Sequence, residues 1–158
     1  MTDASSTHRQ TSPGFPAALA ALEEFGLKFR SGGAHISRTM MLAELGAVLI
    51  DVPKGSSTED YREAILRKNV LGKTTDSTRQ KSLRHLRELY ALDEATPMFG
   101  LLRKLHAIDA VSLPLLAVQV AWARDPLFRA TTPPVMDASA GDRVETVPIR
   151  FIANHEFG

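Results

Sequence analysis

The sequence contains no cysteine, few aromatic residues and no long apolar run. Without cysteine the chain can form no disulfide framework, thiolate zinc site or cysteine nucleophile, and the compartment we expect is the cytoplasm. The longest stretch without a charged residue, Ala110 to Ala123, has 14 residues. A membrane-spanning helix needs roughly 20. We therefore expect a soluble protein without a membrane partner.

Charge is present in nearly equal amounts of both signs, but it is unevenly distributed along the chain. The 158 residues carry a net charge of +1, and their apolar share of 44% is typical of a folded domain. The segment from Arg62 to Tyr90 holds eight basic and three acidic residues, whereas the rest of the chain holds 11 and 15. Positive charge gathered in one segment indicates an anionic partner.

Apolar spacing and cap residues predict an all-α, compact multi-helix domain over residues 15–132. A flexible arm is expected at 1–14, and an irregular, extended tail with a single strand over 144–152 is expected at 133–158. The helices are expected over residues 15–29, 37–49, 57–69, 77–90, 96–105, 112–122 and 125–128. The residues expected in the core are Leu83, Leu86, Leu89, Leu102, Leu105, Leu116 and Trp122, the last two on a helix that is apolar nearly all round.

Two capped helices joined by a turn predict a helix-turn-helix-like unit in the basic segment. Ser57 and Asp60 have the spacing of a capping box, in which each residue satisfies a backbone N–H group of the other. Gly72 suits the left-handed backbone that ends a helix. Ser77, with Gln80 three positions on, is expected to cap the second helix.

The second helix of this unit is predicted to have one apolar and one basic face. At 100° per residue its leucines share one side, while Gln80, Arg84 and Arg87 form a separate ridge. The free N–H groups at its start suit a phosphate, although Asp76 opposes that role. The residues we expect to contact DNA are Lys73, Thr74, Thr75, Ser77, Arg79, Lys81, Arg84 and Arg87.

No pattern in the sequence predicts an enzyme. The five histidines are scattered without metal-ligand spacing, and no nucleophile elbow, Walker motif, zincin motif or nuclease-like acidic cluster occurs. We therefore expect no catalytic residue, no metal and no cofactor. His85, beside the basic ridge, is expected to be exposed to solvent or to contact phosphate, and His106 to be a core or rim residue.

An ordered motif lies within the basic segment. An Ile-x3-Asn-x-Leu-x-Lys stretch precedes a Ser-Thr pair and then a basic helix ending in Leu-Arg-x-Leu. These elements are Ile65, Asn69, Leu71, Lys73, Ser77-Thr78 and Leu86-Arg87-Glu88-Leu89. The motif resembles the BrxA family of BREX phage-defence systems, and the resemblance covers roughly residues 25–135. Members of that family usually continue with a further basic helical segment, whereas residues 133–158 here contain prolines.

The resemblance implies a mostly helical fold likened to the antitermination factor NusB, and binding to DNA. It also implies other BREX proteins as partners, namely a methyltransferase, a large ATPase and a phosphatase-like protein. We therefore expect a non-enzymatic accessory protein that binds double-stranded DNA without sequence preference. The scarcity of aromatic residues favours duplex over single-stranded DNA. Two alternatives stay open: a helical adaptor for another protein of the same system, and an RNA-binding protein of the NusB type.

Overall fold

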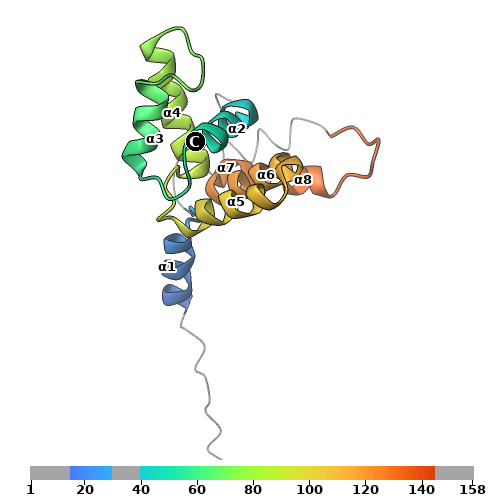
Figure 1. Cartoon of the computed structure of the whole chain (residues 1–158). Helices are drawn as coiled ribbons and strands as arrows, with labels where there is room; N and C mark the ends of the chain where they lie inside the picture. Colours follow the sequence, from blue (N-terminus) through green and yellow to red (C-terminus); the bar gives the residue numbers. More distant parts are fainter. Residues whose placement is uncertain (1–14, 30–39, 145–158) are drawn as a thin grey trace, which may run out of the picture.

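The computed structural model describes residues 15–29 and 40–144. These residues form helices joined by turns, with no strand among them, which confirms the expected all-α fold (Figure 1). The elements are α1 (Phe15–Phe25), α2 (Leu42–Asp51), α3 (Thr58–Leu66), α4 (Asp76–Tyr90), α5 (Pro97–Ile108), the 3₁₀ turn η2 (Ala110–Ser112), α6 (Leu113–Arg124), α7 (Pro126–Thr131) and α8 (Pro133–Met136). The expected arm at 1–14, the expected cap Ser37 and the expected strand beyond Val144 lie outside the described residues.

The core forms where helices α2 to α6 meet. Helix α6 packs against α2, α4 and α5, while α3 packs against α2 and α4. Tyr61 and Phe99 are fully buried, and their rings meet edge to face with centroids 5.5 Å apart. Helices α3 and α4 lie side by side, and α4 also packs against α6 of the neighbouring α5–α6 pair (Figure 1).

The start of α3 follows the prediction, whereas the start of α4 does not. Ser57 and Asp60 form the expected capping box, in which the Asp60 carboxylate accepts from the Ser57 backbone N–H at 2.7 Å. Helix α4 begins at Asp76, and its cap is Thr75, whose hydroxyl accepts from the Thr78 backbone N–H at 3.2 Å. The prediction that Ser77 caps α4 was wrong, because Thr75 already adopts the extended backbone that ends the preceding turn.

Several helix ends also differ from the expected ones. Helix α1 stops at Phe25 because Gly26 has φ +119°, and a Cβ atom there would lie 2.8 Å from the Thr96 methyl group. Helix α3 ends three residues early, and the left-handed Asn69 and Gly72 (φ 54° and 61°) turn the chain towards α4. Helix α7 runs to Thr131, and α8 forms one further turn inside the expected tail.

Five of the seven leucine and tryptophan side chains expected in the core are buried, and two are not. Leu105 is 38% exposed and Trp122 is 43% exposed, because α5 and α6 lie at the surface and each packs only one side inward. Helix α6 packs against α2, α4, α5 and α7, but its apolar circumference is not buried on every side. The expectation for His85 was also wrong, since it is only 7% exposed on the buried side of α4.

Two buried arginines hold neighbouring helices together by hydrogen bonds to backbone carbonyl groups and to the Tyr61 hydroxyl. Arg124 donates to the carbonyl oxygens of Gly26 at 2.7 Å, Glu88 at 3.2 Å and Arg87 at 3.3 Å, which joins the ends of α1 and α4 to α6. Arg103 donates to the Val52 carbonyl at 2.7 Å and to the Tyr61 hydroxyl. These bonds satisfy buried groups that would otherwise be costly, so they hold α3 and α4 in a fixed arrangement.

Candidate nucleic-acid interface

A basic groove runs between α3 and α4. It consists of two hollows of about 480 Å³ and 450 Å³, which share Arg62, Leu66 and Gln80 and therefore adjoin. We call this feature the α3–α4 groove. Its lining residues are Lys28, Arg62, Leu66, Arg67, Asp76, Arg79, Gln80, Leu83, Arg84, Arg87 and Glu88. Six of these side chains are basic and two are acidic, so the groove is strongly positive.

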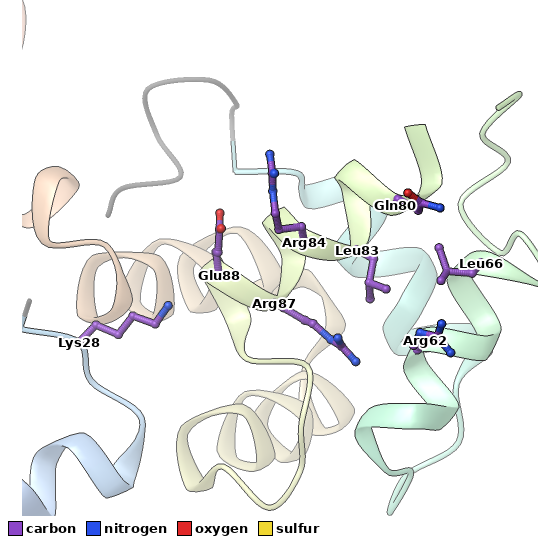
Figure 2. A pocket seen from close by; sticks show the side chains of 8 residues that line it. All are labelled: Lys28, Arg62, Leu66, Gln80, Leu83, Arg84, Arg87 and Glu88. Carbon is purple, nitrogen blue, oxygen red and sulfur yellow. The ribbon is translucent and has the colours of Figure 1, made fainter. Parts of the chain in front are cut away.

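Helical spacing explains why these side chains face the same gap. On α4 the lining residues are spaced three or four positions apart, which puts them on one side of the helix: Gln80, Leu83, Arg84 and Arg87. On α3, Arg62 and Leu66 are four positions apart and share a side in the same way. Leu83 is 6% exposed and belongs to the core, and Leu66 packs against that core from the opposite helix. The groove thus has an apolar floor between basic sides (Figure 2).

Two arginines from opposite helices line the groove. Figure 2 shows the Arg87 side chain extending from α4 towards α3, on which Arg62 lies. Arg62 pairs with Glu59 at 2.7 Å, and Arg87 donates from Nη2 to the Thr58 carbonyl at 3.3 Å. The buried Nε of Arg87 has no hydrogen-bond partner. An arginine has five N–H donors, so both side chains keep donors for an anion.

Lys28 extends the groove towards α1. Its backbone N–H donates to the Ala123 carbonyl at 3.1 Å, which holds the segment after α1 against α6. Burial lowers the pKa of the Lys28 amine, and the positive charge of Arg124 lowers it further. The opposing carboxylate at this end is Glu88, which lies 3.4 Å from the buried His85. The charges of Glu88 and Asp125 oppose these two effects on the pKa of Lys28.

The structure brings together some of the residues expected to contact DNA. Arg79, Arg84 and Arg87 line the groove, whereas Lys81 is exposed on α4 outside the lining. Arg84 and Lys81 form no ion pair with any side chain in the described part of the chain. Arg79 is less available, because it pairs with Asp76 and donates to the Lys73 carbonyl at 3.3 Å.

None of the four residues expected to bind phosphate at the start of α4 lines the groove, and two of them serve other contacts. The Lys73 amine forms an ion pair with Glu44 of α2 at 2.8 Å, and the Thr75 hydroxyl caps α4. Thr74 and Ser77 are exposed, outside the groove lining. Asp76 lies in the first turn and places a carboxylate where the expected phosphate would bind. The positive surface is centred on the groove rather than on this helix start.

Three basic residues of the lining are absent from the site predicted from the sequence. Arg62 and Arg67 belong to the basic segment, and a ridge analysis of α3 like that of α4 would have found Arg62 above Leu66. No helical spacing in the sequence indicates Lys28, because only the packing of the segment after α1 against α6 brings this residue to the groove.

Comparison of the chain with protein-family models, curated proteins and solved structures gave no match. Within residues 15–29 and 40–144, no three histidine, aspartate or glutamate side chains gather in a way that could hold a metal ion. None of the helices in the described part of the chain is long and apolar enough to cross a membrane.

Proposed function

We propose that this protein binds double-stranded DNA, with the basic surface of α3 and α4 holding phosphates. The observation that carries the proposal is the convergence of six basic and only two acidic side chains on the α3–α4 groove. Concentrated positive charge attracts a polyanion, and the release of counterions from DNA on binding makes the association more favourable. The role is one of binding and includes no catalytic step.

Duplex DNA suits this surface better than a single strand. The groove is lined by arginines, one lysine and aliphatic side chains, and no aromatic ring is among its lining residues for bases to stack on. Phosphate contacts carry no sequence information, so binding should be independent of sequence. The resemblance to the BrxA family supports the further proposal that this activity belongs to a BREX-type phage-defence system in the cytoplasm, with the methyltransferase, ATPase and phosphatase-like protein as partners.

A separate observation favours an adaptor role as the second candidate. Helices α5 and α6 and the turn between them expose seven large apolar side chains, which we call the α5–α6 outer face. They are Leu101, Leu105, Ile108, Val111, Leu115, Val118 and Trp122. Exposed apolar side chains in such number are typical of protein contacts. In this role the protein would bind another protein of the same system through this face.

Removing the unpaired cations tests the proposal. We expect the triple variant Arg67→Ala, Lys81→Ala and Arg84→Ala to flatten the dependence of log K on log salt concentration by about 2–3 units, since each lost phosphate contact removes about 0.9. Affinity for every duplex sequence should fall to a similar extent. Thermal stability should stay nearly unchanged, because exposed charges contribute little to folding. Fluorescence anisotropy at several salt concentrations and a melting curve measure both effects.

A charge-matched variant separates the surface from the total charge. Lys54, Lys104 and Arg143 are exposed and lie outside the groove lining. Changing these three to Ala should leave the salt dependence close to that of the parent protein. Unchanged DNA affinity in a folded groove-side triple variant would refute the DNA proposal and leave the adaptor role in its place. Competition by structured RNA that exceeds competition by duplex DNA would favour the RNA-binding alternative.

A further inference from the structure

The centre of the α3–α4 groove has two arginines, Arg62 and Arg87, that could bind one anion together. Arg62 and Arg87 come from opposite helices and line the same hollow, and Figure 2 shows the Arg87 side chain extending towards the side of the groove where Arg62 lies. Two like charges repel unless an anion lies between them. Glu59 accepts one N–H group of Arg62 at 2.7 Å, and the Thr58 carbonyl accepts one N–H group of Arg87, so each guanidinium keeps further donors for an anion.

The surroundings of these arginines fit a nucleotide better than a bare ion. The hollow of about 480 Å³ around them lies in the size range of small-molecule sites. Leu66 and Leu83 provide apolar surface beside the arginines, and Gln80 provides an amide that can donate and accept hydrogen bonds. A phosphate alone would use the arginines and leave the apolar floor uncovered.

We infer that the α3–α4 groove binds a nucleotide phosphomonoester, with the phosphate between Arg62 and Arg87 and the sugar and base against Leu66 and Leu83. In nucleic acid this group is the phosphorylated end of a strand, so the inference rests on the proposed DNA binding and makes it more specific. A free mononucleotide carries the same group. The protein would thus hold duplex DNA by its backbone and prefer phosphorylated ends.

Charge and geometry both favour a terminal over an internal phosphate. A phosphomonoester carries about 1.5–2 negative charges at pH 7, whereas each phosphodiester of the backbone carries one. It also presents three terminal oxygens, enough for two guanidinium groups to bind at once. Lys28, at the end of the same hollow, adds a further cation, while Glu88 opposes it.

The test compares duplexes that differ only at their ends. A blunt duplex with 5′-phosphates should bind at least about tenfold more tightly than the same duplex with 5′-hydroxyls, because charge-assisted bonds to two arginines are gained. Arg62→Gln should abolish this preference. The Arg62 side chain is 52% exposed, so the variant should fold normally, which a melting curve checks. Arg62→Lys should keep only part of the preference, since lysine cannot bind two oxygens side by side.

Lys81→Gln is the matched control, because Lys81 is exposed on α4 but does not line the groove. It should weaken both duplexes equally and leave their ratio unchanged. Deoxyadenosine monophosphate and deoxyadenosine, titrated by calorimetry, provide the free-nucleotide arm, and only the monophosphate should bind.

The outcomes separate this inference from the proposed function. Equal affinity for the two duplexes, without binding of the monophosphate, would overturn the inference and leave DNA binding intact. A preference that survives in Arg62→Gln would also overturn it, because the site would lie elsewhere. Monophosphate binding that needs Arg62, in a protein that binds no duplex, would support the phosphomonoester site and refute the DNA proposal.

Discussion

The α3–α4 groove and the α5–α6 outer face are both formed by neighbouring helices, but they expose opposite chemistry. The groove is lined by six basic side chains, with Leu83 buried and Leu66 partly buried among them. The outer face exposes seven large apolar side chains, among them Ile108 at 83% and Leu115 at 61%. Water solvates the first surface favourably, whereas exposure of the second is unfavourable.

This difference shows what an amphipathic pattern does and does not determine. Helix α4 separates leucines from cations, so only one side of it can be buried without desolvating charge. Helix α6 has apolar residues in nearly every direction, so several orientations bury similar area. Its inward side is chosen by contacts with α2, α4 and α5, in which the small Ala117 and Ala121 permit close packing.

The largest expected effect comes from a matched pair of leucine substitutions, one on each side of this comparison. Leu86 is fully buried beneath the basic ridge of α4, and Leu115 is 61% exposed on the outer face. Leu86→Ala should lower the free energy of unfolding by about 2–5 kcal/mol, because it removes buried apolar contacts and leaves a cavity. Leu115→Ala should change it by less than about 0.5 kcal/mol. Urea unfolding of both variants measures the contrast.

The paired design makes either failure informative. A small loss in Leu86→Ala would mean that the buried side of α4 is assigned incorrectly. A loss in Leu115→Ala as large as that in Leu86→Ala would mean that the outer face is covered in solution.

A smaller effect is expected at the start of α3, where the Ser57–Asp60 capping box fixes the turn that Arg87 contacts at Thr58. Ser57→Ala should cost about 1 kcal/mol of stability at pH 7. The matched control is Thr96→Val at the start of α5, because the Thr96 hydroxyl forms no capping hydrogen bond. That variant should stay within about 0.5 kcal/mol of the parent protein.

The effect of Ser57→Ala should also depend on pH. Hydrogen bonds from the side chain and then the backbone of Ser57 lower the pKa of Asp60 below its ordinary value. A lowered carboxylate pKa stabilises the fold above the ordinary value of about 3.9, and this contribution is lost as pH falls through the lower value in the fold. The difference between Ser57→Ala and the parent protein should therefore narrow below about pH 4. A difference that widens on acidification would contradict the capping geometry.

The fold could be predicted wherever local chemistry specified it. The Ser57–Asp60 box and the leucine stripe of α4 are local signals, and both were confirmed. The burial of His85 and the exposure of Trp122 could not be found in this way. Those depend on which side of α4 or α6 the rest of the bundle covers, and a single helix does not contain that information.

The groove could be predicted only in part, for the same reason. The ridge of Arg84 and Arg87 follows from the spacing within α4, and the structure places both residues in the groove lining. The facing position of Arg62 requires the α3–α4 packing, and that of Lys28 requires a contact between segments nearly 100 residues apart. Engagement of Lys73 by Glu44 likewise depends on where α2 lies.

The smallest effect on stability is expected from making the outer face polar. Changing Leu101, Leu115 and Val118 to Gln should leave the melting temperature nearly unchanged. The three side chains are 45%, 61% and 42% exposed, so the substitutions remove little buried apolar contact. The same change should reduce binding of a hydrophobic dye, since it removes much of the exposed apolar area. DNA affinity and its salt dependence should stay those of the parent protein, because none of the three residues lines the α3–α4 groove. Loss of DNA binding together with dye binding would show that the two surfaces act jointly, and the contrast between them would then be one of chemistry but not of role.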